Sequence, residues 1–282
     1  MKTRLPAAAG SFYPDNDGEL RTQIQQCFLH RLGPGMIPSV PSLVDDRLVG
    51  LVVPHAGYMF SGPVAAHSYY HLALAGPRRS VVILGPNHSG EGSGVSANTS
   101  GQWSTPLGEV PVDEQLGSRI VKNSRLIDVE DKAHASEHSI EVQLPFLQFI
   151  YPRQFRFVPI CMMLQDLETS KEVGEAVATA AKETGAIIVA SSDWTHYEPQ
   201  DKAVLKDKEA LGAVLEMDPA HFQEMIEDTR VSACGYGPVT ALIHASGFMG
   251  VKHVTLLSYH TSGEMTGDKA AVVGYAALMF TR

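Results

Sequence analysis

Short apolar runs alternate along this chain with longer stretches in which apolar residues recur at helical spacing. The runs that predict strands are Leu48–Val53, Val81–Leu84, Phe155–Ile160, Ala186–Ala190, His253–Tyr259 and Ala271–Phe280. The stretches that predict helices are Glu19–Arg31, Pro63–Ala75, Asp113–Lys122, Ser136–Leu147, Leu167–Glu183, Asp201–Leu215, Pro219–Glu227 and Val239–Ser246. Such alternation is typical of α/β proteins. We predict one three-layer α/β domain over residues 1–282, with a central mixed, mostly parallel sheet.

Three segments of this pattern carry more specific expectations. The last two apolar runs are separated by the polar turn Thr261–Asp268, which predicts an antiparallel hairpin at a sheet edge. Glu91–Pro111 has no clear period and is expected to be a long functional loop. Asp17 is expected to cap the first helix.

Composition and charge narrow the class of protein. The chain has 282 residues, and 44% of them are hydrophobic, which is enough to bury a large core. A formal net charge of −9 argues against nucleic acid or an anionic membrane as the main partner. No apolar run approaches the roughly 20 residues that span a bilayer, and no signal peptide is indicated. We therefore expect a cytoplasmic protein, whose three cysteines are too few for a disulfide framework.

Histidines follow three of the predicted strands. His55 comes after Leu48–Val53, His88 comes after Val81–Leu84, and His196 lies in the loop after the fourth run. If these strands are parallel neighbours, the three imidazoles meet at the carboxyl edge of the sheet, where ligands bind in open α/β folds. A single histidine at a strand end is usually structural. Three at equivalent positions indicate an active site or a metal site.

Cys234 adds a thiol to this group. It precedes Gly235 and a predicted helix, whose amino-terminal N–H groups would favour a thiolate. Imidazole and thiolate are ligand types for first-row transition metals. Taken alone, however, a cysteine is equally well read as a small buried apolar residue.

Further groups are candidates for acid–base chemistry or for supporting the ligands. Asp193 and His196 lie on one loop, and His138 and Glu141 are three residues apart on a predicted helix, so each pair could reach the same cavity. The sequence has no GxGxxG or GxxxxGK[ST] motif for nucleotides and no GxSxG motif of serine hydrolases.

These motifs together resemble the Memo-like family, also called AmmeMemoRadiSam system protein B, over nearly the whole chain. The matching segments are Pro54–Tyr58, Ser61–Gly62, Leu84–His88, Glu137–Leu147, Ser191–Asp193, His196–Tyr197, Cys234–Gly235 and Gly237–Pro238. The resemblance implies a fold similar to that of class III extradiol dioxygenases, which hold non-haem iron.

The resemblance also implies a set of site residues. It places the metal at His55, His88 and Cys234, with Asp193, His196 and His138 around the same pocket. The related dioxygenases use two histidines and a glutamate, so Cys234 departs from their pattern and puts ring cleavage in doubt. A thiolate softens the site toward copper, zinc or redox-active iron.

Three functional hypotheses follow. The first is an oxidoreductase that uses Fe(II) or copper on an unknown small substrate, with His196 or His138 as acid or base. The second is a zinc-dependent hydrolase in which Asp193 or Glu141 activates water. The third is a peptide- or protein-binding module with a vestigial pocket. The family name further implies a functional association with a radical-SAM protein and an AMMECR-type companion.

Overall fold

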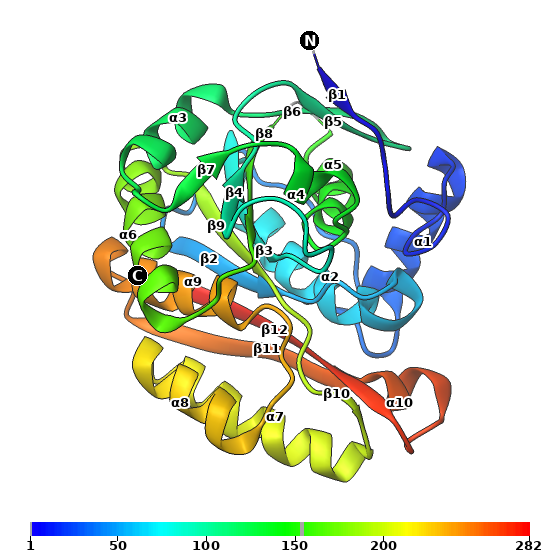
Figure 1. The fold of residues 1–282 in the computed structure, drawn as a ribbon. Coiled ribbons are helices and arrows are strands. Elements are labelled where there is room, and N and C mark those ends of the chain that lie inside the picture. Colours follow the sequence, from blue (N-terminus) through cyan, green and yellow to red (C-terminus); the bar gives the residue numbers. More distant parts are fainter. Residues whose placement is uncertain (1, 153–154) are drawn as a thin grey trace.

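A nine-stranded mixed sheet forms the middle layer of the structure (Figure 1). The computed structural model describes residues 2–152 and 155–282. The strands of this sheet are β2 (Leu48–Val53), β3 (Ser80–Pro86), β4 (Val95–Ala97), β7 (Ile127–Val129), β8 (Arg156–Met162), β9 (Ile187–Ser191), β10 (His196–Glu198), β11 (His253–Thr261) and β12 (Val272–Thr281). Their order is β10-β12-β2-β9-β3-β8-β4-β7, and β11 pairs with β12.

Four parallel neighbours, β2, β9, β3 and β8, form the centre of the sheet, and antiparallel pairs flank them. β12 lies antiparallel to both β2 and β11, which confirms the predicted C-terminal hairpin. The prediction of one α/β domain with a mixed sheet is confirmed, and the sheet is parallel at its centre, as expected. A second, three-stranded sheet has the order β1-β5-β6, from β1 (Thr3–Arg4), β5 (Gln102–Thr105) and β6 (Gly108–Pro111).

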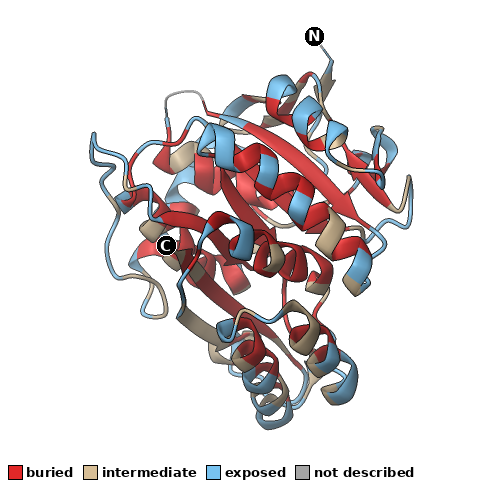
Figure 2. Cartoon of the chain, turned by 90° about the vertical axis from the view of Figure 1, so that its left-hand side faces the viewer, coloured by how far each residue is buried: buried red, intermediate tan, exposed pale blue. Residues whose placement is uncertain are grey.

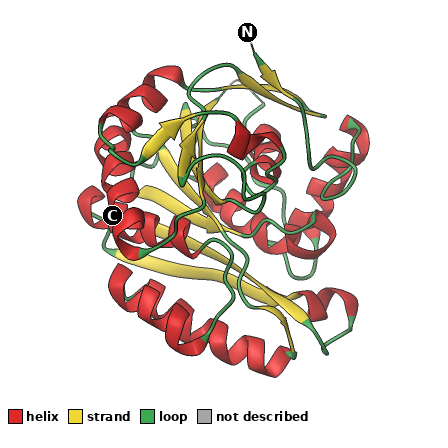
Figure 3. Ribbon diagram, in the orientation of Figure 1, coloured by secondary structure: helices red, strands yellow, loops and turns green. Residues whose placement is uncertain are grey.

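Helices cover both faces of the sheet (Figure 3). They are α1 (Asp17–Leu29), α2 (Tyr58–Leu74), α3 (Glu114–Lys122), α4 (Lys132–Ala135), η1 (Glu141–Gln143), α5 (Leu144–Ile150), α6 (Leu167–Thr184), α7 (Gln200–Leu215), α8 (Pro219–Thr229), α9 (Tyr236–Met249) and α10 (Ser262–Thr266). Alternate residues of one strand face opposite layers, so Leu51 packs with α1, α2 and α5, whereas Val52 packs with α6 and α9. Figure 2 shows the buried inner faces of these helices and their exposed outer faces.

Several predicted boundaries were wrong. Asn16, not Asp17, caps α1, because its side chain accepts the Glu19 N–H. The expected loop Glu91–Pro111 contains β4, β5 and β6, which are too short to show a period in the sequence. The second helix begins at Tyr58, before Pro63.

The predicted helix Ser136–Leu147 was also wrong. Residues 136–140 are not helical, a short 3₁₀ turn covers Glu141–Gln143, and α5 begins only at Leu144. Pro145 lies in the first turn of α5, where its missing N–H costs nothing. A helix from Ser136 would have placed Pro145 in its interior, where it breaks the hydrogen-bond pattern.

Candidate metal centre

Three side chains follow the carboxyl ends of neighbouring strands. His55 lies two residues beyond β2, Asp193 two residues beyond β9, and His88 two residues beyond β3. Because β2, β9 and β3 are adjacent and parallel, these positions meet at one edge of the sheet. The structure therefore places Asp193 at the position that the sequence pattern gave to His196.

Cys234 enters from the loop between α8 and α9. Its loop approaches the end of β9 so closely that a Cβ atom on Gly235 would lie 2.2 Å from the Ser191 carbonyl oxygen. Only glycine permits this approach, which explains the Cys-Gly pair at this point. The Asp193 N–H donates to Cys234 Sγ at 3.3 Å and holds the sulfur against the strand end.

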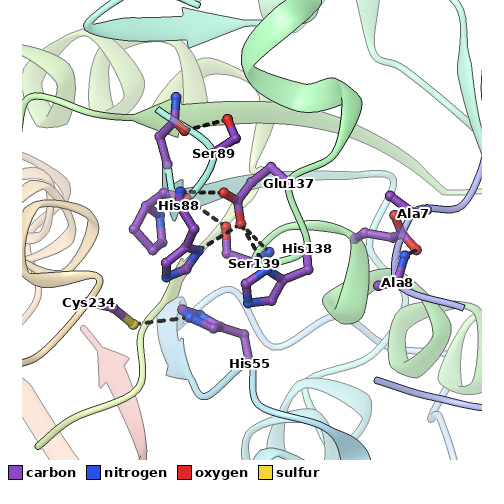
Figure 4. A network of polar contacts seen from close by, with 12 residues as sticks. Ala7, Ala8, His55, His88, Ser89, Glu137, His138, Ser139 and Cys234 are labelled. Atoms are coloured by element: carbon purple, nitrogen blue, oxygen red, sulfur yellow. Dashed lines mark hydrogen bonds and ion pairs between the residues drawn. The ribbon is translucent and has the colours of Figure 1, made fainter. Parts of the chain in front are cut away.

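The ligand atoms of His55, His88 and Cys234 converge (Figure 4). One ligand atom from each residue lies within 4.8 Å of the other two, and His55 Nε2 is 3.1 Å from Cys234 Sγ. Metal–nitrogen and metal–sulfur bonds are about 2.0 to 2.3 Å long, so separations of this size suit three ligands of one ion. The family resemblance implied these same three residues as the metal ligands.

A buried carboxylate fixes the ring of His88. Glu137 Oε1 lies 2.9 Å from His88 Nδ1, and Oε2 accepts the His88 backbone N–H at 2.5 Å. Burial opposes the charge of Glu137, but the hydrogen bonds from His88 and Ser139 hold its pKa at about 2. An ionised carboxylate can only accept, so Nδ1 of His88 carries the proton and Nε2 keeps a free lone pair.

A hydroxyl fixes the ring of His55. Ser191 Oγ donates its one proton to the Ser139 carbonyl at 2.7 Å and accepts from Gln143 Nε2 at 2.9 Å. Gln143 Nε2 also donates to the Pro54 carbonyl, which settles the orientation of that amide. Ser191 must therefore accept from His55 Nδ1, 2.8 Å away, and the free lone pair of His55 is on Nε2, facing Cys234.

Burial raises the pKa of the Cys234 thiol well above its usual value, and the nearby Asp193 raises it further. The sequence-based expectation of a thiolate stabilised by the α9 terminus is therefore wrong for the metal-free protein. The thiol proton lies between Sγ and the free nitrogen of His55. Two imidazole nitrogens, whose ring protons are held on the outer side, and a sulfur whose proton a metal would displace fit the donor set of a transition-metal site.

His138 and Asp193 adjoin this cluster. The ring of His138 stacks on that of His88 at a centroid distance of 4.6 Å and on Phe12 at 4.2 Å. Burial lowers the pKa of His138 to about 4, so the ring is neutral near pH 7. Asp193 is buried, its Oδ1 accepts the His55 N–H at 2.8 Å, and burial raises its pKa. The fully buried Trp194 follows it.

His196 and Glu141 are the two predicted site residues that the structure does not bring into the cluster. His196 Nδ1 bonds the Ser232 carbonyl at 2.9 Å, two residues before Cys234, so its ring flanks the centre. Glu141 is fully buried and faces the N-terminal segment instead: its oxygens accept from Arg4, from the N–H groups of Ala7 and Ala8, and from the Tyr13 hydroxyl.

Glu137 and Ser191, which orient the two histidines, received no role from the sequence. The signal for Glu137 was Pro145, which marks the true start of α5 and leaves residue 137 in a loop beside the strand ends. His88, Glu137 and His138 also lie within 4.8 Å of one another. Because Glu137 already accepts from His88 and Ser139, this second group supports the ligands of the first.

Comparisons with known proteins identify the family of this chain. A profile of the family described as "Memo-like protein" matches residues 4–279. The chain belongs to the Memo-like family. It is 50% identical to a MEMO1 family protein of Methanopyrus kandleri and covers 99% of both chains. It is 47% identical to a relative in Methanothermobacter thermautotrophicus, with 98% of this chain and 99% of the relative covered.

The fold of this Memo-like chain also resembles a solved structure. An uncharacterised Escherichia coli K12 protein matches with a TM-score of 0.60 and 14% identity, over 82% of this chain and 99% of the other. At that identity the likeness concerns the fold alone. Among the described residues, no helix is long and apolar enough to cross a membrane.

Proposed function

We propose that this Memo-like protein is a metal-dependent oxidoreductase that holds iron or copper at His55, His88 and Cys234. One observation carries the proposal: three ligand atoms converge while Glu137 and Ser191 keep the imidazole protons on the far side. A site that served only packing would have no need of free lone pairs aimed at one point. The mixed nitrogen and sulfur donor set favours a redox-active soft metal over a hard cation.

A bound iron or copper ion would supply one-electron redox chemistry and open positions for O₂ and a small substrate. The protein's own groups supply orientation and proton handling. The neutral ring of His138, stacked between Phe12 and His88, is placed to accept a proton from a substrate at the cluster. His196 has its Nδ1 proton on the Ser232 carbonyl, so its Nε2 offers a second proton acceptor.

Metal content tests the proposal. The native chain and the variants His55→Ala, His88→Ala and Cys234→Ala are purified without oxygen and analysed by mass spectrometry. We expect about one iron or copper per native chain and loss of it in all three variants. Lys122→Ala, on the exposed surface of α3, is the matched control and keeps its metal.

The outcomes separate the alternatives. If the native chain contains iron or copper and the three variants do not, the proposal is supported and substrates can be screened under O₂. Stoichiometric zinc would favour the hydrolase, whose activity needs no oxygen. No metal after anaerobic reconstitution would overturn the metalloenzyme and favour a peptide- or protein-binding module. The cytoplasmic location and the association with a radical-SAM protein and an AMMECR-type companion stay predictions, which copurification from cell extract would test.

A further inference from the structure

Cys234 differs from the two histidine ligands in how the fold holds it. Both histidines lie two residues beyond a strand of the central sheet, whereas Cys234 lies in the loop between α8 and α9. The end of β9 fixes one side of this loop, where the Cys234 N–H donates to the Asp193 carbonyl at 3.3 Å. The other side of the loop, which carries the Cys234 carbonyl, needs a partner from elsewhere in the fold.

Gln165 supplies that partner. It lies three residues beyond β8, the fourth parallel strand at the centre of the sheet, and is partly buried. Its Nε2 donates to the Cys234 carbonyl at 2.9 Å, and its Oε1 accepts the Gly237 N–H at 2.8 Å. Because a carbonyl only accepts and an N–H only donates, these two bonds settle the orientation of the amide. One side chain thereby connects the ligand residue with the first turn of α9.

The start of α9 is built for this contact. Its N-cap, Gly235, has no side chain that could accept an N–H, so the Gln165 oxygen takes the place of a capping group. A Cβ atom on Gly237 would lie 2.7 Å from the Cβ atom of Gln165, so only glycine lets the amide approach. Pro238 follows and has no N–H that would need a partner. The contact with Gln165 therefore explains Gly237, to which the sequence pattern alone assigned no role.

The backbone of Gln165 is itself held in place. Its carbonyl accepts from Gln223 Nε2 at 2.9 Å and from the Ser170 hydroxyl at 3.2 Å, so α8 and α6 both fix the loop that carries it. Gln223 is buried, and its Nε2 also donates to the Thr240 hydroxyl of α9 at 3.0 Å. A supporting residue positions a site precisely when it is fixed in this way. The amide therefore holds the Cys234 loop from a rigid base.

The position of the sulfur decides which metals the centre prefers. A metal–sulfur bond is about 2.3 Å long, so a loop that is free on its carbonyl side would keep the sulfur at bonding distance only part of the time. Thiolates select soft, thiophilic ions, whereas imidazoles alone suit ions such as nickel. A centre with a loosely held Cys234 would therefore bind metal much as a pair of histidines does.

We propose that Gln165 is a positioning residue that holds Cys234 at the metal centre and so sets the preference of the centre for thiophilic metals. This inference rests on the proposed function, because it requires the three ligands to share one ion. The two histidines have Ser191 and Glu137 as their supporting residues, and Gln165 completes the set for the third ligand.

Two divalent ions test the inference. Cd²⁺ is thiophilic, whereas Ni²⁺ binds well to imidazole alone, so the ratio of their dissociation constants reports whether the thiolate takes part. Competition with a chelator measures both constants on the native chain and on Gln165→Ala. We expect the preference for Cd²⁺ to fall about tenfold in Gln165→Ala, as for other groups that support metal ligands. Cys234→Ala defines the ratio in the absence of the thiolate.

Gln165→Glu separates the positioning of Cys234 from the capping of α9. Its carboxylate still accepts the Gly237 N–H but cannot donate to the Cys234 carbonyl. We expect it to lose the Cd²⁺ preference as Gln165→Ala does. A preference that Gln165→Glu retains would show that the residue only caps α9 and would overturn the inference. Gln148→Ala is the matched control, because the Gln148 amide also makes two hydrogen bonds, both to the β5–β6 hairpin, and its loss should leave the preference unchanged.

Alkylation of the metal-free protein supplies a readout that needs no metal. Cys27 and Cys161 are buried, so Cys234 is the thiol that iodoacetamide reaches first. We expect Gln165→Ala and Gln165→Glu to speed its modification severalfold, because the freed loop opens more often, and mass spectrometry of the modified peptide measures the rate. Faster alkylation, combined with a native chain that binds neither ion, would leave Gln165 its hold on Cys234 and overturn the proposed function. Equal rates together with an unchanged preference would overturn the role of Gln165.

Discussion

Glu137 and Glu141 are four residues apart and both buried, yet they serve different regions of the molecule. Glu137 faces the metal centre and accepts from His88. Glu141 faces the N-terminal segment, pairs with Arg4 and accepts from Ala7, Ala8 and Tyr13. In Figure 4, Ala7 and Ala8 lie on the far side of His138 from Cys234.

The difference lies in what each carboxylate leaves free. Around Glu141 each carboxylate oxygen accepts two hydrogen bonds, and the Arg4 guanidinium also covers the Trp103 ring at 4.2 Å. Around Glu137 the protonated side of His88 is fixed while its other nitrogen stays available. A closed network of this kind anchors a segment of chain. A network that fixes a ring but leaves one of its nitrogen lone pairs available prepares a metal-binding site.

The largest effect is expected when the Glu141 network is broken. Glu141→Gln leaves Arg4, whose side chain is only 12% exposed, without its counter-ion and presents an amide N–H₂ group to other donors. We expect a loss of about 3 kcal/mol in the free energy of unfolding. Urea unfolding of metal-free protein measures it, because bound metal would add its own stabilisation. Glu141→Gln should still bind as much metal per chain as the native protein. If it loses metal but keeps native stability, the assignment of Glu141 to the fold and not to the metal centre is wrong.

Glu137→Gln should have the opposite profile. The amide cannot hold the Nδ1 proton of His88 with a full charge, so the ring loses orientation and donor strength. We expect metal affinity to fall about 10- to 100-fold, as for other groups that support metal-bound histidines. Competition with a chelator of known affinity measures the change. If Glu137→Gln binds metal as tightly as Glu141→Gln does, the distinction between the two carboxylates is wrong.

His134 lies in α4, and its backbone carbonyl accepts from Arg4, so it belongs to the region around Glu141. The pH dependence of stability tests this region. Burial lowers its pKa to about 4, from a usual value near 6.5. Between these values the unfolded chain takes up a proton that the folded chain resists, so stability is complete above pH 6.5 and falls as the pH decreases. Between pH 7 and pH 5 the native chain should lose on the order of 2 kcal/mol more than His134→Leu does.

Urea unfolding of the metal-free proteins at both pH values tests this expectation. Equal losses in the two chains would show that His134 does not titrate as its burial requires. His253→Leu, at an exposed position, is the matched control for replacing a histidine by leucine.

The smallest effect is expected at the other histidine ligand. Ser191→Ala removes the acceptor of His55 Nδ1 and leaves the Gln143 amide with the Pro54 carbonyl. Because a neutral hydroxyl orients the ring less strongly than a carboxylate, we expect about a tenfold loss of metal affinity, the lower end of the range for such groups. Ser191→Thr keeps the hydroxyl and should recover most of it. A loss greater than that of Glu137→Gln would reverse the order.

The central sheet could be predicted from the sequence because its strands are short, continuous apolar runs with both faces covered. Leu48–Val53 was predicted at the bounds that β2 has in the structure. The strands β4, β5 and β6 could not be predicted in this way. Their three or four residues are too few for the two-residue alternation of a strand to stand out, and pairing with other strands defines them.

The grouping of His55, His88 and Cys234 followed from strand ends and from a family resemblance, whereas their supporting residues depend on contacts over long distances in sequence. Ser191 reaches His55 across 136 positions. Glu141 looked like the site carboxylate because a continuous helix would have put it on the face of His138. The turn that Pro145 permits rotates Glu141 toward Tyr13 and leaves Glu137 at the centre.

The chain has two tryptophans, and each lies in one of the two regions. Trp103 packs beneath Arg4, and Trp194 follows Asp193 at the metal centre. Each region therefore contains its own natural fluorophore. A paramagnetic ion at the centre should quench the emission of Trp194 more strongly than that of Trp103, and undocking of the N-terminal segment should shift Trp103 alone to longer wavelength. With one tryptophan changed to phenylalanine at a time, the two variants report metal loading and segment anchoring separately.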